Sequence, residues 1–520
     1  MMTRTIGFTL PAKVIALVTG LILAISALFV SPALAAPVNI VNNADWYDTD
    51  GNVIWNSGGF VIKKSETYYW YGMDYSVSGA KRVKLYTSTD LKNWTKQTNS
   101  SNPNSVVDFS TINPKLDAIG DTTTTRFAED TNHWIGRPVV AYNSSTSKYV
   151  MLAEWNNSDG NGRNKLAFFT SSNPAGPFTF DNFIAKPSGY SMGDLGSIFT
   201  DADGSTYITF TIDYFPTSYN SGLQIAKLNT DYLGIASNTK TFASGYPHKE
   251  ATTLFKYGTK YMMMASATNG WGSSGTYYYS TTSLTGTWSE TEVEAGTSPS
   301  SSNSFDTQID QVLPVEGTAG TAYVYMGDRW NNFGGSTGIG RNQWYPLSFD
   351  ANGKPTINGY GAWQLDAAAG TWTTAPSPID VTKTYSISIR WPGKGLGIVG
   401  GSTANNAKLE QRTYSGATGQ SWKFIDAGGG YFNIRNVTSG LNLTLGGSTA
   451  DGTQVIQYTP STSTSQQFSI LPTGGGYYKL INRGSGKVLG NAGNGADGAI
   501  ITQYTDANEW SQMFSFTVLP

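Results

Sequence analysis

Cysteine is absent from the 520 residues, and histidine occurs only twice. Without cysteine the chain has neither disulfide bonds nor a thiol nucleophile, and two histidines argue against a catalytic zinc site. The sequence therefore predicts no metal site and no cofactor. A chain of this length without disulfides depends on its own hydrophobic cores for stability.

Charged residues are also scarce, at 13% against the roughly 25% typical of globular proteins. The 34 basic residues are balanced by 36 acidic ones, so the charge gives no reason to expect nucleic acid or an anionic membrane as a partner. Glycine (59), tyrosine (30) and tryptophan (15) are abundant instead. This composition is typical of strands and tight turns, and the aromatic faces suit stacking on sugar rings.

Long apolar runs are missing except at the start of the chain. Arg4 and Lys13 flank the beginning of this segment, the apolar run covers residues 14–30, and Ala33-Leu34-Ala35 follows as a small-x-small cleavage site. This pattern predicts a signal peptide over residues 1–35 and a secreted, extracellular protein. A retained membrane anchor is the alternative, because the run is near the short limit for a spanning helix.

The region that follows contains many short apolar and aromatic segments separated by turns. Five segments look alike in pattern, and in four of them alternating apolar residues flank a polar hairpin turn such as Asp203-Gly204. The first parts of these segments cover residues 58–72, 137–155, 196–211, 250–266 and 312–330. Repetition of one such unit favours blades over a sandwich. The sequence predicts an all-β protein in which residues 36–372 form a five-bladed β-propeller.

The last part of the chain has a regular repeat. Gln-x-aromatic triplets end 46 residues apart, at Trp422, Phe468 and Phe514. Further glutamines recur at the same step, at Gln411, Gln457 and Gln503. Three β-rich units of this kind resemble the ricin-type β-trefoil, which we expect over residues 383–520 after a linker over residues 373–382.

Several short motifs in the propeller region are found together in one known family. They are Asp48-Thr49-Asp50-Gly51-Asn52, Tyr68-Tyr69-Trp70-Tyr71-Gly72, Ser88-Thr89-Asp90-Leu91-Lys92-Asn93-Trp94, Gly136-Arg137-Pro138, Lys249-Glu250-Ala251, Asn269-Gly270-Trp271, Gln308 and Tyr325-Met326-Gly327-Asp328-Arg329-Trp330. In these motifs the region resembles glycoside hydrolase family 43, and specifically its exo-β-1,3-galactanase branch. Such enzymes work with carboxylic acids, which agrees with a chain that has no cysteine and few histidines.

The resemblance implies a role for three carboxyl residues. Glu250 would be the general acid, which needs a raised pKa to hold its proton near neutral pH. Asp194 would tune and orient that acid, and Glu154 would contact the terminal sugar. Further residues that we expect at the substrate are Arg137, Tyr71, Trp271, Trp330 and Asp74.

The catalytic base is an open point. Most of family 43 has an aspartate base near the first strand, whereas the galactanase branch resembles a variant without it. In that branch a glutamine holds the attacking water, and Gln308 is at the matching position. An amide is not an effective base, so another group has to accept the proton. Asp45, Asp48 and Asp50 are the alternatives in the first-strand region.

Two residues depart from the branch. Met73 follows the Tyr-Trp-Tyr-Gly motif where the branch has a glutamate, with Asp74 next, and Ser57 replaces a histidine. In the trefoil, Gly397, Thr444 and Gly490 stand where sugar-binding trefoils carry an aspartate. This leaves the glutamines at 411, 457 and 503 as the trefoil's candidate sugar contacts, with a spacer role as the alternative.

Together these features predict a monomeric, exo-acting, inverting glycoside hydrolase that releases galactose from β-1,3-galactan, the backbone of arabinogalactan. A second interpretation keeps the family but makes the substrate an α-L-arabinofuranoside or a β-xyloside, because of the two departures. A third is a non-catalytic protein that only binds polysaccharide.

Overall fold

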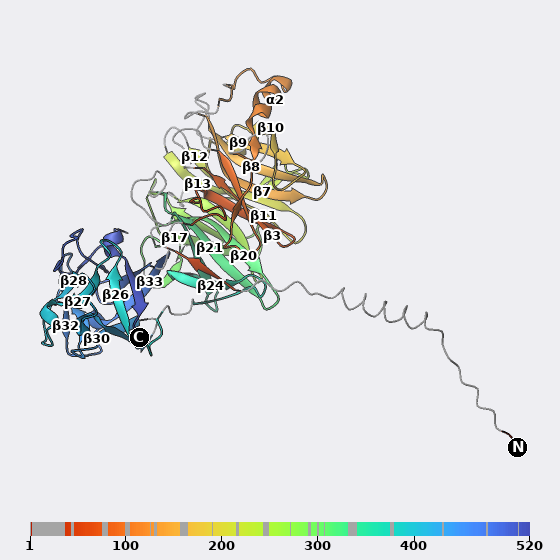
Figure 1. Ribbon diagram of the computed structural model, residues 1–520. Helices are drawn as coiled ribbons and strands as arrows, with labels where there is room; N and C mark the ends of the chain where they lie inside the picture. Colours follow the sequence, from red (N-terminus) through yellow and green to blue (C-terminus); the bar gives the residue numbers. More distant parts are fainter. Residues whose placement is uncertain are drawn as a thin grey trace. The chain divides into compact units, whose positions relative to one another are not determined.

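The computed structural model describes Met2 and residues 37–520, with gaps at 43–45, 75–81, 99–104, 125, 129–132, 157–164, 190, 215–217, 243–248, 271, 290–292, 299–300, 306, 331–340, 375–378, 429–430, 475–476 and 508. The predicted signal peptide lies almost entirely outside the described residues. Strands dominate the described part, which is labelled in Figure 1. Among its helices, α2 (Ile112–Ala118) is short, and none is long and apolar enough to cross a bilayer.

Five sheets of four or five strands make up most of the first region. The first sheet contains β2 (Ser57–Lys64), β3 (Thr67–Met73), β4 (Val83–Ser88) and β5 (Thr95–Lys96). The second contains β7 (Trp134–Asn143), β8 (Lys148–Asn156), β9 (Lys165–Ser171), β10 (Phe178–Ile184) and β6 (Val107–Asp108). The third contains β11 (Ser191–Thr200), β12 (Thr206–Tyr214), β13 (Ser218–Leu228) and β14 (Ile235–Phe242).

The fourth sheet contains β15 (Lys249–Tyr257), β16 (Lys260–Ala267), β17 (Thr276–Thr281) and β18 (Val293–Glu294). The fifth contains β20 (Gln308–Glu316), β21 (Thr321–Asp328), β22 (Asn342–Phe349), β23 (Pro355–Asn358) and β19 (Gly296–Ser298). Strands β2, β7, β11, β15 and β20, which begin their sheets, contact one another in this order, and β20 contacts β2 again. These five strands therefore surround the axis of the propeller.

A sixth sheet corrects the predicted number of blades from five to six. It consists of β1 (Val38–Val41), β24 (Ala362–Asp366) and β25 (Thr371–Thr374), and β1 pairs antiparallel with β24. Trp363 of this sheet shares one buried core with Trp70 of the first sheet and Trp344 of the fifth. The hairpin repeat predicted the other blades because it is local, whereas this sheet joins segments more than 300 residues apart.

The second region is a β-trefoil, as predicted. Six strands close a barrel by successive pairing: β26 (Tyr385–Ile389), β29 (Trp422–Gly428), β30 (Tyr431–Asn436), β33 (Phe468–Gly474), β34 (Tyr477–Asn482) and β37 (Phe514–Val518), which returns to β26. Three further hairpins are β27–β28 (Gly395–Ile398, Leu409–Arg412), β31–β32 (Asn442–Leu445, Val455–Tyr458) and β35–β36 (Val488–Gly490, Thr502–Tyr504). The aromatics of the three triplets are fully buried in one core, which explains their repetition.

Candidate active site

An irregular pairing interrupts each of the five inner strands close to its beginning. The register shifts lie between Ser57 and Phe60, Gly136 and Val139, Met192 and Leu195, Glu250 and Thr253, and Ile309 and Gln311. Bulges turn side chains away from the regular alternation of a strand and are common next to active sites. Two residues in these interruptions, Arg137 (φ 42°) and Ala251 (φ 53°), have a left-handed backbone that non-glycine residues rarely adopt. The inner strands therefore present irregular, strained segments at one end of the axis.

Arg137 is at the centre of the polar groups in these segments. Its Nε donates a hydrogen bond to the carbonyl of Leu195 at 2.9 Å, and Glu154 Oε1 accepts from the Leu195 N–H at 2.7 Å. Arg137 Nε and Glu154 Oε1 are 3.8 Å apart. The two side chains thus bind the two peptide groups on either side of the Leu195 Cα, next to Asp194, and both are at least nine-tenths buried.

Four carboxylates surround the Arg137 guanidinium. Burial alone would lower the pKa of Arg137, but their charges raise it above its ordinary value. They are Asp194, Asp310, Glu154 and Glu250. Arg137 is therefore the shared counter-ion of a buried acidic cluster.

Glu250 is the member of this cluster with the properties of a general acid. Glu250 is the second residue of β15 and is 6% exposed. Burial and the nearby charge of Asp194 raise its pKa to about 7, against the opposing effect of Arg137. Glu250 consequently holds its proton up to near-neutral pH, as a proton donor requires.

Gln308 lies directly against Glu250. Its Nε2 is 3.0 Å from Glu250 Oε1, 3.0 Å from the Gly270 carbonyl and 2.7 Å from the Gly272 carbonyl. The amide group is therefore engaged with protein acceptors, and its carbonyl oxygen is the atom left to orient a water. The contact with the acid is much shorter than the roughly 6.5–9.5 Å usual between an acid and a base in inverting enzymes.

Asp310 and Asp328 form a buried carboxyl pair to which the sequence analysis gave no role, although Asp328 belongs to one of the family motifs. The two residues are 5% and 1% exposed, and a hydrogen bond joins their side chains. Such a bond requires one shared proton, and burial raises the pKa of both groups. Asp328 accepts from Gly58 N at 2.6 Å and from Asn342 Nδ2 at 2.8 Å, and Asp310 Oδ1 is 3.9 Å from Arg137. The available signal was a carboxyl group two residues after Gln308 in the same strand.

This arrangement predicts unequal effects of two similar substitutions. Asp328→Asn would place an amide donor against the Gly58 N–H or the Asn342 amide, so we expect a loss of about 1–3 kcal/mol in unfolding free energy. Asp310→Asn can replace the shared proton with its own N–H and should cost less. Because both pKa values are raised, native stability should fall as the pH rises, and Asp310→Asn should reduce that dependence. Urea unfolding at pH 5 and pH 8 measures both effects; equal losses in the two variants would contradict this geometry.

The other predicted contacts divide into those that reach this cluster and those that do not. Trp330 does, with its ring 5.9 Å from the Arg137 guanidinium, and it packs with Met73. Asp74 forms a buried ion pair with Lys84 at 2.9 Å. Tyr71 does not reach the cluster, which corrects that prediction: it is wholly buried in the core and its hydroxyl donates to the Pro174 carbonyl.

Some candidates cannot be placed or have another structural role. Trp271 and Asp45 lie outside the described residues. Asp48 Oδ1 accepts hydrogen bonds from the backbone of Asp50 and Asn52, so it shapes a turn. Within the described residues, no group of three or more His, Cys, Asp or Glu side chains is arranged to hold a metal ion.

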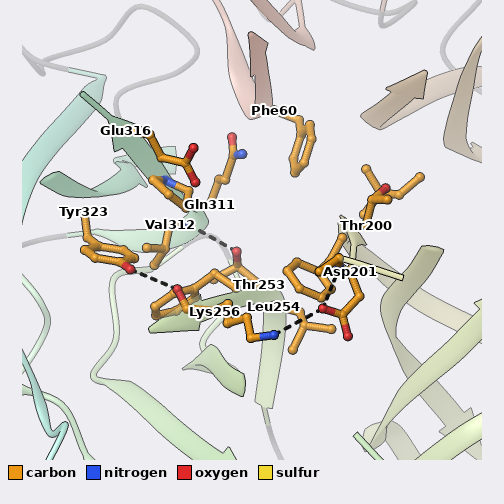
Figure 2. Close-up of a pocket in the computed structure, with 15 residues that line it drawn as sticks. Phe60, Thr200, Asp201, Thr253, Leu254, Lys256, Gln311, Val312, Glu316 and Tyr323 are labelled. Carbon is orange, nitrogen blue, oxygen red and sulfur yellow. Dashed lines mark hydrogen bonds and ion pairs between the residues drawn. The ribbon is translucent and has the colours of Figure 1, made fainter. Parts of the chain in front are cut away.

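A cavity of about 310 Å³ is lined by residues that follow the acidic cluster along the inner strands, and Phe60 is one of these lining residues (Figure 2). Its lining includes Thr253 and Gln311, which follow Glu250 and Gln308 by three residues on β15 and β20. Two carboxylates, Asp201 and Glu316, line the cavity. Asp201 is 3.3 Å from Lys256 Nζ and accepts from the Tyr261 hydroxyl. Against the effect of burial, these contacts lower the pKa of Asp201, so this group is not suited to donate a proton.

In the trefoil, the three predicted sugar contacts have a structural role instead. Gln411, Gln457 and Gln503 are 0% exposed. Each donates from Nε2 to two carbonyls of a neighbouring loop and accepts from a further side chain: Asn491, Ser439 and Ser485, respectively. These glutamines hold the loops of the trefoil together.

The model of the glycosyl hydrolases family 43 matches residues 56–355, more than half of the chain. The chain belongs to glycoside hydrolase family 43. The acidic cluster on the propeller axis is thus in a glycoside hydrolase. The ricin-type beta-trefoil lectin domain-like model matches residues 362–458, 446–504 and 464–519, so the family 43 domain is followed by a lectin-like trefoil.

Two solved structures are similar over most of the chain. An exo-β-1,3-galactanase from Clostridium thermocellum is 30% identical, over 92% of this chain and 100% of that one, with a TM-score of 0.57. An exo-β-1,3-galactanase from Phanerochaete chrysosporium, solved with galactose, is 23% identical over 93% of both chains, with a TM-score of 0.56. None of the curated proteins compared with the chain matches it.

Proposed function

We propose that this family 43 enzyme is secreted, acts as a monomer and removes galactose from the end of β-1,3-galactan chains with inversion. The observation that supports the chemistry best is Glu250, a buried acid whose pKa is raised to about 7 beside Asp194 and Arg137. The substrate is proposed from the similarity to the Clostridium thermocellum protein, which is named as an exo-β-1,3-galactanase.

In this mechanism Glu250 donates its proton to the glycosidic oxygen while the bond from that oxygen to the anomeric carbon breaks. A water bonds to the opposite face of the same carbon, which inverts its configuration. Gln308 orients that water through its carbonyl oxygen. This requires its amide to move away from Glu250 when the substrate binds, because their 3.0 Å contact leaves no room for the sugar carbon and the water between them. The water's proton has to pass to another group because an amide is not basic, and the carboxylates around Arg137 are acceptors that the cluster offers.

One observation favours keeping a second substrate class open. Met73 packs with Trp330, and a side chain built at Gly58 would meet Met73, Arg137 and Trp330. The cluster therefore has an apolar group where the galactanase branch has a carboxylate. An arabinofuranoside or xyloside offers fewer hydroxyl groups to bind than galactose and would lose less from this change.

Incubation of the chain lacking residues 1–35 with β-1,3-galactan, β-1,4-galactan, arabinan and xylan tests the proposal, with Glu250→Gln as the matched control. We expect free galactose from β-1,3-galactan alone, released first as the α-anomer in the proton NMR spectrum. Arabinose or xylose instead would keep the family and overturn the substrate. If no polymer released sugar but one still bound, the non-catalytic alternative would replace the proposal.

A further inference from the structure

Two tryptophans of the trefoil are unusually exposed. Trp391, in the turn between β26 and β27, is 42% exposed, and Trp510, at the start of the 3₁₀ turn Trp510–Gln512, is 55% exposed. They are adjacent, because the Trp391 N–H points to the Trp510 carbonyl at 3.4 Å. Exposed clusters of large apolar groups commonly mark binding surfaces.

The pair breaks the threefold repeat of the domain. At a step of 46 residues, Thr464 and Thr418 stand in the places of Trp510, and the equivalent backbone hydrogen bonds put Thr438 and Gly484 in the places of Trp391. The backbone junction itself is preserved in all three repeats, since Ser421, Gln467 and Met513 each accept a hydrogen bond from the facing turn. The two indoles are therefore not needed to build the junction.

Arg390 precedes Trp391 in this turn, and Val437 and Arg483 stand in its place in the other two repeats, because all three donate the equivalent backbone hydrogen bond. The Arg390 guanidinium lies 4.6 Å from the Tyr477 ring centre, as that of Arg483 lies 4.5 Å from the Tyr431 ring centre. Arg390 differs in also lying 4.2 Å from the Trp510 ring centre. Stacking of this kind fixes the rings and places hydrogen-bond donors beside them.

Trp391 has a comparable support on its other side. Its Cη2 lies 3.1 Å from the position of a side chain built at Gly495, so the loop around this glycine packs against the edge of the indole. The Trp391 carbonyl accepts from Asn491 Nδ2 at 3.0 Å. Both indoles are thus held in place before any partner binds, which lowers the entropy that binding costs.

We propose that Trp391 and Trp510 form a stacking platform for a neutral polysaccharide, with Arg390 bonding to its hydroxyl groups. Sugar rings present flat C–H faces next to hydroxyls, which fits two indoles beside one guanidinium better than it fits an anionic surface, for which several cations would be needed. The usual carboxylates of the trefoil are replaced by Gly397, Thr444 and Gly490, so binding in this domain has to depend on stacking. That the polysaccharide is β-1,3-galactan rests on the proposed function.

The test measures binding of the full chain to β-1,3-galactan, β-1,4-galactan, arabinan and xylan by affinity electrophoresis, in the Glu250→Gln background to prevent hydrolysis. Changing both Trp391 and Trp510 to Ala should weaken binding about tenfold or more, as expected for the loss of two aromatic contacts. Tyr458→Ala is the matched control, because Tyr458 is a 43% exposed aromatic of the same domain outside the platform. Changing both tryptophans to Phe should restore part of the affinity and excludes a folding defect.

In the catalytically active background, the double alanine variant should hydrolyse a short soluble galacto-oligosaccharide at the normal rate. If it binds β-1,3-galactan as tightly as its parent, or if the parent binds none of the four polymers, the platform is overturned. If the parent instead binds another of the polymers and the double variant loses that binding, the platform is supported and the proposed galactan substrate is overturned.

Discussion

Replacing Glu250 by Gln should lower kcat on the susceptible polysaccharide by a factor of about 10²–10⁴, the usual contribution of a general acid. Gln has nearly the shape of Glu and can accept the Gln308 hydrogen bond through its own carbonyl oxygen. KM should therefore change little, which separates a catalytic loss from a binding loss. Initial rates over a range of polysaccharide concentrations give both constants.

The pH dependence of kcat in the parent enzyme tests independently whether Glu250 is the proton donor. With a pKa of about 7, Glu250 is protonated below neutrality, so kcat should fall as the pH rises through 7. The remaining activity of Glu250→Gln should not show this step. A variant with a normal rate, or with the step unchanged, would show that another group donates the proton.

Glu250→Gln should also increase stability in alkaline solution. The folded-state pKa is raised above the unfolded value of 4.5, so the contribution of this group is fully present below pH 4.5 and is lost as the pH rises through about 7. A shift of this size corresponds to roughly 3 kcal/mol at 1.36 kcal/mol per pKa unit. The neutral Gln avoids that loss, and an acid that is both required for the rate and unfavourable for stability indicates a functional residue.

Local patterns predicted most of the fold and failed where the structure is not local. Hairpins and the 46-residue repeat depend on neighbouring residues, so the larger sheets and the trefoil were predictable. The pairing of Val38 with Leu365 was not, because no short pattern contains both partners. Tyr71 belonged to a motif of the family, yet alternation along β3 places its ring in the core between sheets.

The site was predictable residue by residue but not as a cluster. The resemblance to the family pointed to Glu250, Asp194 and Arg137. In the structure both carboxyl groups lie close enough to Arg137 for their charges to raise its pKa. The common orientation of the three residues arises from bulges in three separate strands, β15, β11 and β7, and bulges have no clear sequence pattern. The pairing of Asp310 with Asp328 across β20 and β21 likewise depends on the register shift after Ile309.

Arg137 should be the residue whose loss affects stability most. In Arg137→Met the carboxylates that share this cation would remain buried without it, and removing one partner of a buried ion pair costs about 3–5 kcal/mol. The backbone strain at φ 42° is the same in both side chains, so it cancels in the comparison. Urea unfolding at pH 7 against the parent measures the loss.

The pH dependence of that loss distinguishes charge from packing. Without the cation the pKa values of the neighbouring carboxyl groups should rise, so these groups become protonated, and neutral, at a higher pH. The loss of unfolding free energy in Arg137→Met should therefore be smaller at pH 5 than at pH 8. Arg137→Lys keeps one charge, but one ammonium group cannot reach both the Leu195 carbonyl and Asp310 in the way the guanidinium does, so its deficit should be intermediate. A deficit of the same size at every pH would mean instead that Arg137 stabilises the propeller by packing against Trp330, and that the acidic cluster is neutralised in another way.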